Sequence, residues 1–214
     1  MKNLKDLLLL YAVTDRRWLG DRTLEDAVEH VVRGGATIVQ LREKEASREE
    51  FLRLAYSVLA VCRRYGVPLI INDDVDIAIE CGADGVHVGQ DDMEITSARR
   101  RLGPDKIIGV SAHNAEEALR AERGGADYLG SGAVFHTGTK RVGHTLSNEE
   151  LSNITSAVKI PVVAIGGIEA DNMHLLKGTG AAGAAVVSAI FAAENIEEET
   201  RRLKHIAEET FLSV

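Results

Sequence analysis

The stretch RGGATIVQLR, residues 33–42, carries the turn on which the fold prediction rests. Its glycines suit the left-handed C-cap of a helix, and the branched apolar residues after them begin a strand. Three other stretches resemble it: ECGADGVHVG (80–89), RGGADYLGSG (123–132) and GTGAAGAAVV (178–187). The chain therefore uses one helix-to-strand turn repeatedly.

Working outward from these turns, the sequence predicts eight strands that alternate with eight helices. The strands are expected near 7–14, 37–43, 68–73, 85–89, 107–112, 128–134, 161–166 and 184–189. The helices are expected near 24–34, 48–65, 75–81, 93–102, 115–124, 147–158, 171–178 and 196–211.

Such alternation predicts a parallel sheet with right-handed crossovers, and eight units in 214 residues fit an α/β fold of the (β/α)8 TIM-barrel type. A doubly wound open sheet, which usually has fewer strands, is the alternative. No long linker or change of composition divides the chain, so we expect a single TIM-barrel domain over residues 1–214.

Composition and charge limit the possible partners. The chain is 45% hydrophobic and 27% charged, as in a globular protein with a sizeable core, and its net charge of −8 argues against broad nucleic-acid or anionic-membrane binding. The apolar run in residues 1–15 is too short to span a membrane and has no cleavage pattern, so we expect a cytoplasmic protein. Cys62 and Cys81 are predicted to be reduced, buried thiols. A homo-oligomer is left open.

Polar residues gather where the second strand ends. Gln40, Arg42 and Lys44 are two residues apart, so a strand would place all three on one face. Two cations beside an amide suit a phosphate-rich ligand. The alternative is that Arg42 pairs with Glu43 or Glu45 at the rim of the barrel.

Carboxylates follow the third and fourth strands, in NDD (72–74) and QDD (90–92). Carboxylates at neighbouring strand ends are suited to Mg²⁺, which prefers oxygen ligands and commonly bridges to phosphate. The alternative is that they cap the following helices or lie in their first turns. We expect helix capping or first-turn positions for Asp74 and Asp91, and the metal role for Asp73 and Asp92.

The fifth strand places Ser111 and His113 on one face. Ser111 has a hydroxyl that can donate to phosphate. For His113 two interpretations stay open, a hydrogen-bonded rim residue or a general acid/base. His87, in the middle of the fourth strand, is predicted to be a core histidine whose ring nitrogens are hydrogen-bonded.

Two later segments predict further anion binding. Thr137, Thr139 and Lys140 offer hydroxyls and a cation in a glycine-rich loop, although the spacing is not that of a P-loop. Gly166 and Gly167 follow the seventh strand and would let the backbone approach a ligand, and Ser188 belongs to the eighth strand. The loops after these two strands commonly bind phosphate in such barrels. A tight turn followed by a helix cap is the alternative.

Taken in order, these motifs resemble the thiamine phosphate synthase family, also called thiamine-phosphate pyrophosphorylase. The resemblance runs through nearly the whole chain, in YAVTD (11–15), QLREK (40–44), NDD (72–74), GVHVGQDD (85–92), GVSAH (109–113), DYLGSGAVF (127–135), TGTK (137–140), AIGGI (164–168) and VVSAI (186–190). It implies a (β/α)8 transferase that joins hydroxymethylpyrimidine diphosphate to a thiazole phosphate and releases diphosphate.

The resemblance also implies roles for individual residues. The pyrimidine diphosphate would be bound by Gln40, Arg42, Lys44, Asn72, Ser111 and Lys140. The cofactor Mg²⁺ would be held by Asp73 and Asp92. The thiazole phosphate would be received, partly through backbone groups, by Thr137, Thr139, Gly167, Val187 and Ser188. The catalytic set would be Arg42, Lys44, Ser111 and Lys140, which would assist a dissociative departure of diphosphate.

The sequence differs from the usual family pattern at two positions, and other functions on the same barrel are possible alternatives. The family usually has prolines where this chain has Ala133 and His136. A related thiazole tautomerase would use His113 as its acid/base and would need no diphosphate site. Two further rivals are a sugar-phosphate isomerase or aldolase on the same barrel, and a non-catalytic protein that binds thiazole phosphate.

Overall fold

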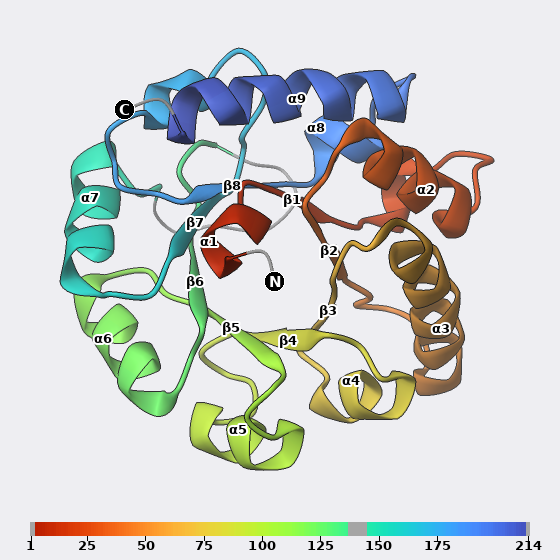
Figure 1. Cartoon of the computed structure of the whole chain (residues 1–214), viewed down its shortest axis with the longest axis horizontal. Helices are drawn as coiled ribbons and strands as arrows, with labels where there is room; N and C mark the ends of the chain where they lie inside the picture. Colours follow the sequence, from red (N-terminus) through yellow and green to blue (C-terminus); the bar gives the residue numbers. More distant parts are fainter. Residues whose placement is uncertain (1–2, 137–144, 213–214) are drawn as a thin grey trace.

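The computed structural model describes residues 3–136 and 145–212, and its strands form a closed parallel barrel in the order β1 to β8 (Figure 1). Each strand pairs in parallel with the next along the chain, and β8 pairs with β1 to close the ring. The predicted (β/α)8 architecture is confirmed. An open sheet is wrong, because β1 and β8 are hydrogen-bonded neighbours.

The strands are short and the helices surround them (Figure 1). The strands are β1 Leu10–Val13, β2 Ile38–Leu41, β3 Leu69–Asn72, β4 Gly85–Val88, β5 Ile107–Ser111, β6 Tyr128–Gly132, β7 Val162–Ile165 and β8 Gly183–Val186. The α-helices are α1 Leu4–Leu7, α2 Leu24–Gly34, α3 Arg48–Tyr65, α4 Val75–Cys81, α5 Ile95–Leu102, α6 Ala115–Gly124, α7 Asn148–Ala157, α8 Ser188–Phe191 and α9 Ile196–Phe211. Two 3₁₀ turns, η1 Arg16–Trp18 and η2 Met173–Leu176, complete the described elements.

The repeated glycine turn ends three of the helices as predicted. Gly35, Gly82 and Gly125 are the C-caps of α2, α4 and α6, with φ values of 105°, 74° and 96°. Their N–H groups bond to carbonyls of the last helical turn, which are otherwise without intrahelical partners. Each cap turns the chain into the next strand, and the turns together produce the ring.

The largest differences from the predicted elements lie at residues 4–7, at residues 173–176 and at the end of the eighth strand. Residues 4–7 form α1, because the Asn3 side chain accepts from Lys5 N and starts a helical turn before β1. Residues 173–176 form a 3₁₀ turn in place of the helix expected over 171–178. The eighth strand ends at Val186, because Val187 has φ −116° and ψ −87°, and Ser188 begins α8.

The apolar residues form an inner and an outer core. The inner cluster fills the barrel and includes Tyr11, Ile38, Ile70 and Tyr128, whereas the outer cluster lies between the strands and the helices. The helix α1 crosses the centre of the ring in Figure 1, and Leu4 packs against the inner cluster. Since α1 precedes β1, this apolar cover lies at the amino ends of the strands. The opposite end is available for a site.

The two cysteines behave as predicted. Cys62 and Cys81 are free and buried, and burial raises the pKa of the Cys62 thiol to about 12. In the described part of the chain, no helix has the length and apolar character needed to cross a membrane.

Candidate active site

Charged side chains from the ends of β2, β3 and β4 meet at the carboxyl end of the barrel. Lys44 Nζ forms an ion pair with Asp73 Oδ2, and Asp92 Oδ2 accepts from Gly89 N at 2.6 Å. Asp73 has a positive φ of 65°, an uncommon backbone conformation for a residue other than glycine. Strained residues of this kind cluster at functional sites, so the observation supports a role for this corner.

The two carboxylates of this corner influence each other. Partial burial and the neighbouring carboxylate of Asp73 raise the pKa of Asp92 above its ordinary value. Bringing two acids together is unfavourable unless a cation shares them, and the Lys44 ammonium supplies a cation here. A divalent cation would fit the same place, since its preferred ligands are carboxylate oxygens.

The donor set of protein groups is small. Among the described residues, no group of three or more His, Cys, Asp or Glu side chains is arranged to hold a metal ion. An ion at Asp73 and Asp92 would therefore take its remaining ligands from water and from substrate phosphate, which is the usual habit of Mg²⁺. The residues present fit Mg²⁺ bound together with a substrate.

The side chain of Arg42 does not form an ion pair with Glu43 or Glu45, the two acids that follow it in the sequence. Its backbone N donates to Thr14 Oγ1 at 3.0 Å, which fixes the start of the loop after β2. Glu43 instead bonds to Arg16, with 2.9 Å between Glu43 Oε2 and Arg16 Nε. Within the described ranges the Arg42 guanidinium makes no hydrogen bond or ion pair, so it remains available for a ligand.

Gln40 and Ser111 lie at opposite ends of a hydrogen-bond chain inside the barrel. Gln40 Nε2 donates to Tyr11 Oη at 2.9 Å, and Tyr11 Oη is 2.7 Å from Tyr128 Oη. His87 then lies between Tyr128 and Ser111, with Nδ1 2.9 Å from Tyr128 Oη and Nε2 3.0 Å from Ser111 Oγ. The prediction that both ring nitrogens of His87 are hydrogen-bonded is confirmed, although the residue is half-buried and not fully enclosed in the core.

Sequence reasoning did not single out Tyr11 or Tyr128. Both are about 1% exposed or less and occupy inward positions of their strands. The available signal was the two-residue periodicity that also places Gln40 and His87 inside. A buried phenol needs a hydrogen-bond partner, so two inward tyrosines on one barrel predict a polar network.

Asn72 ends β3 beside this network. It is 8% exposed, and its side chain has no hydrogen-bond partner among the described residues. Its Cα partner in β4 is His87. A nearly buried amide at the barrel mouth with free donors and acceptor can serve a bound ligand.

The two acids expected to cap or begin helices have different outcomes. Asp74 caps α4, since its Oδ1 accepts from Ile77 N at 2.8 Å, as predicted. The prediction for Asp91 is wrong, because α5 begins only at Ile95 and its cap is Glu94. The helix starts later than the acidic run suggested, which leaves Asp91 exposed in the connecting loop.

His113 is a rim residue. Its backbone N donates to Glu117 Oε2 at 2.8 Å, its ring Nδ1 lies 3.0 Å from the same oxygen, and its side chain is 47% exposed. The interaction joins the end of β5 to the first turn of α6. This geometry favours a rim position for the residue over an acid/base role.

Gly166 and Gly167 are required by the loop after β6. They have φ values of 102° and 65°. A Cβ on Gly166 would lie 2.4 Å from Ala133 Cβ, and one on Gly167 would lie 2.3 Å from the His136 carbonyl oxygen. The sequence predicted that these two glycines allow the backbone to approach a ligand. In the structure it is residues 133–136 that approach them closely.

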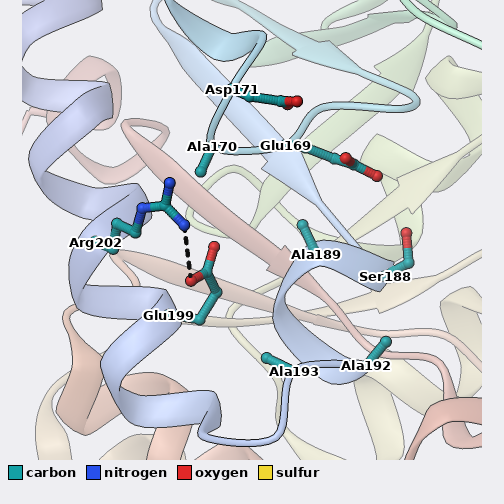
Figure 2. A pocket seen from close by; sticks show the side chains of 9 residues that line it. All are labelled: Glu169, Ala170, Asp171, Ser188, Ala189, Ala192, Ala193, Glu199 and Arg202. Atoms are coloured by element: carbon teal, nitrogen blue, oxygen red, sulfur yellow. Dashed lines mark ion pairs between the residues drawn. The ribbon is translucent and has the colours of Figure 1, made fainter.

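Val187 is the N-cap of α8 and Ser188 is its first residue, and Ser188 lines a pocket of about 520 Å³. Figure 2 shows that the pocket lies between the loop after β7, α8 and α9. Its ionisable residues are Glu169, Asp171, Glu199 and Arg202, and Arg202 Nη1 pairs with Glu199 Oε2 at 3.5 Å.

The pocket holds three carboxylates and one guanidinium that is already paired, so its net negative charge would repel a phosphate. A phosphate at Ser188 would instead lie on the barrel side of α8. No side chain caps the start of that helix, so its first backbone N–H groups are not satisfied by a cap. Thr137, Thr139 and Lys140 lie outside the described residues, and their assignments stay predictions.

Comparisons with known proteins agree with the resemblance seen in the motifs. A family model described as thiamine monophosphate synthase matches residues 10–190. The chain is 51% identical over 192 residues to a thiamine-phosphate synthase of Clostridium acetobutylicum, covering 90% of this chain and 91% of that one. It is 50% identical over 204 residues to the thiamine-phosphate synthase of Clostridium botulinum, covering 95% of each.

A solved structure gives the same picture. The thiamine phosphate pyrophosphorylase from Pyrococcus furiosus superposes with a TM-score of 0.89 and is 41% identical, covering 97% of this chain and 99% of that one. Sequence and fold are therefore similar to the same group of proteins over nearly their full lengths.

Proposed function

The chain belongs to the thiamine monophosphate synthase family, and we propose that the two halves of its barrel mouth bind the two substrates of that reaction separately. The enzyme is a transferase that joins hydroxymethylpyrimidine diphosphate to thiazole phosphate, forming thiamine phosphate and diphosphate. In the proposal, the ends of β2 to β5 hold the pyrimidine diphosphate with Mg²⁺. The ends of β6 to β8 receive the thiazole phosphate.

The observation that carries the proposal is the meeting of the Lys44 ammonium with two carboxylates at one corner of the mouth, with Arg42 close by in the sequence at the end of β2. Lys44 and Asp73 are paired, Asp92 lies beside Asp73, and Arg42 has no ion-pair partner among the described residues. A bound diphosphate would accept from Arg42 and Lys44, and Mg²⁺ would be held by Asp73 and Asp92. Lys44 would then exchange a carboxylate partner for phosphate.

The chemistry requires stabilisation of a leaving group. When the bond to diphosphate breaks, negative charge grows on the departing oxygens, and Arg42 and Lys44 stabilise it through charge-assisted hydrogen bonds. Mg²⁺, when bound, adds positive charge at the same oxygens. Lys140 is proposed to contribute a third cation from its loop. No protein nucleophile is required, because the thiazole nitrogen attacks once it is correctly placed.

The thiazole phosphate half is proposed to rely on small groups. Gly167 and Val187 offer backbone near the mouth, Ser188 offers a hydroxyl, and Thr137 and Thr139 are expected to add hydroxyls from their loop. Backbone N–H groups at the start of α8 are suited to an anion, because no side chain caps that end. The small side chains of this half leave room for the second substrate beside the first.

The test is a coupling assay with purified protein, both substrates, and Mg²⁺ present or removed by a chelator. We expect thiamine phosphate and diphosphate in equal amounts, and only with Mg²⁺. Equal turnover without Mg²⁺ would contradict the metal assignment. Absence of product from folded protein that binds both substrates would contradict the proposed site as a whole.

A further inference from the structure

We propose that Tyr11, Tyr128 and His87 are positioning residues that fix which hydrogen-bonding atom Gln40 and Ser111 each present to the pyrimidine substrate. A chain of hydrogen bonds runs from Gln40 to Ser111 through these three residues. We call Tyr11, Tyr128 and His87 the relay. The proposal rests on the proposed function, because it takes Gln40 and Ser111 as pyrimidine-binding residues. It adds to the proposed function the direction of the hydrogen bonds, that is, which of the two residues donates to the substrate and which accepts from it.

The relay is continuous, and its two phenols are enclosed, whereas His87 is half-buried. The four links from Gln40 to Ser111 are 2.9 Å, 2.7 Å, 2.9 Å and 3.0 Å between successive donor and acceptor atoms. Tyr11 is 1% exposed and Tyr128 is 0% exposed, so water does not compete for their hydroxyls. Each phenol therefore bonds to its neighbours in the chain, and the orientation of one hydroxyl determines the next.

The direction of the relay starts at the amide. Gln40 Nε2 can only donate, so Tyr11 Oη accepts from it and gives its own proton to Tyr128 Oη. Tyr128 in turn donates to His87 Nδ1. A neutral imidazole that accepts at Nδ1 carries its proton at Nε2, so His87 donates from Nε2 to Ser111 Oγ.

The two phenols transmit this direction because each keeps its proton. Burial raises the pKa of Tyr11 well above its ordinary value, and burial together with the nearby Tyr11 does the same for the pKa of Tyr128. Each hydroxyl therefore has one proton to donate at neutral pH. Reversing the direction requires the Gln40 amide to present its oxygen, and no longer its nitrogen, to Tyr11.

The two ends of the chain present complementary groups. Ser111 Oγ already accepts from His87, so its own proton is directed to a ligand, and Ser111 acts as a donor. The side chain of Gln40 bonds to the described residues only through Nε2, which leaves Oε1 to accept from a ligand, so Gln40 acts as an acceptor. An aminopyrimidine diphosphate fits this pair, because its exocyclic amine donates to Gln40 and a ring nitrogen or phosphate oxygen accepts from Ser111.

Two glycines make room for the relay. A Cβ on Gly109 would lie 2.1 Å from Tyr128 Cζ, and one on Gly130 would lie 3.0 Å from His87 Cε1. Both glycines occupy inward positions, and neither has a positive φ that would require glycine. A side chain at either position would collide with the ring of Tyr128 or come very close to that of His87, which explains why both residues are glycine. The neighbouring strands therefore leave room for the relay.

The direct test is the tautomer of His87 in ligand-free, ¹⁵N-labelled full-length protein, measured by long-range ¹H–¹⁵N NMR. We expect the proton on Nε2. The His87 signals are identified by their change in Tyr128→Phe, and the matched control Tyr65→Phe removes an exposed hydroxyl on α3 that bonds to Glu29. A proton on Nδ1 in the wild-type protein would overturn the proposed polarity.

A kinetic readout separates positioning from mere stability. Tyr128→Phe is expected to raise the KM for the pyrimidine diphosphate about 5- to 10-fold, the usual size of one neutral hydrogen bond, and to leave the KM for thiazole phosphate unchanged. Equal changes in both KM values, or a lower melting temperature alone, would overturn the positioning role. Wild-type turnover is measured separately, so a failure of the proposed function is not confused with a failure of the relay.

Discussion

At the ends of β2, β3 and β4 the barrel mouth carries full charges, whereas at the ends of β6, β7 and β8 it carries glycines and small side chains. The first half, called the charged half, includes Arg42, Lys44, Asp73 and Asp92. The second, called the small-residue half, includes Gly166, Gly167 and Ser188. One fold thus positions groups in two ways, by charged side chains in one half and by backbone conformation in the other.

The difference concerns what each half can tolerate. A charged side chain acts through its own atoms, so its removal should affect ligand chemistry more than folding. A glycine at positive φ beside a neighbouring loop acts through the backbone, so its replacement should affect folding as well as binding. Replacing a charged side chain, or the Ser188 hydroxyl, should therefore give a binding defect, whereas replacing Gly166 or Gly167 should give a folding defect.

The largest effect is expected for Arg42→Ala. Its guanidinium makes no ion pair within the described ranges, so the change should leave folding intact. Turnover should fall by about 10²- to 10³-fold, as for other electrostatic stabilisers of a developing charge. Steady-state kinetics measures this, with Arg53→Ala, an exposed position on α3, as the control. Unchanged turnover in Arg42→Ala would remove the residue from the site.

Gly167→Ala should mainly destabilise the protein. The new Cβ would lie 2.3 Å from the His136 carbonyl oxygen at a residue with φ 65°. We expect a loss of about 2 to 4 kcal/mol in the free energy of unfolding, from backbone strain plus overpacking. The matched control is Gly178→Ala, which has φ 83° and no atom within 4 Å of the new Cβ. Equal losses in urea unfolding would show that close packing against residue 136 is unimportant.

Ser188→Ala should have a moderate and selective effect. A hydrogen bond to a charged phosphate contributes about 1.5 kcal/mol or more, so the KM for thiazole phosphate should rise about 10-fold. The KM for the pyrimidine diphosphate should stay the same. Ser57→Ala, which removes a hydroxyl that bonds within α3, serves as the control. A rise in both KM values would indicate that the two halves are not independent.

The smallest effect is expected for Asp92→Asn without Mg²⁺. The pKa of Asp92 is raised in the folded protein, so the native state binds its proton more tightly than the unfolded state. Stability contributed by this group therefore falls as pH rises through that pKa. At pH 8, Asp92→Asn should melt slightly higher than the wild type, and the difference should shrink at acidic pH.

With Mg²⁺ present, the wild-type protein should melt at a higher temperature than Asp92→Asn. The ion is expected to stabilise the wild-type protein through Asp92 and to stabilise Asp92→Asn less. Asp91→Asn, at the exposed neighbouring residue to which no ligand role is assigned, is the control. Melting temperatures that rise equally with Mg²⁺ in both variants would argue against Asp92 as a ligand.

The alternation of elements was predictable because it depends on local patterns. Glycine caps such as Gly35 and Gly125, and short apolar strands such as Ile38–Leu41, are visible in the sequence. The charged half was predictable for a related reason, since polar residues directly after apolar strands stand out. The helix start at Ile95 was misplaced, because either Asp91 or Glu94 is a chemically suitable cap.

Other features depend on contacts between distant residues. The sequence shows that Gly167 is a glycine, but only the fold shows that residues 135 and 136 approach it. Tyr11 and Tyr128 are 117 residues apart, and their hydrogen bond exists because the ring closes around them. The pairing of Arg16 with Glu43, which removes that acid as a partner for Arg42, likewise exists because folding brings η1 next to the loop after β2.

The most direct test of the two-half account is a crossed titration by calorimetry. Pyrimidine diphosphate with Mg²⁺, and thiazole phosphate, are each titrated into the wild-type protein, Arg42→Ala and Ser188→Ala. We predict that Arg42→Ala loses affinity only for the pyrimidine diphosphate and that Ser188→Ala loses affinity only for the thiazole phosphate. Parallel losses of both ligands in either variant would contradict the separation of the two substrates between the halves of the mouth.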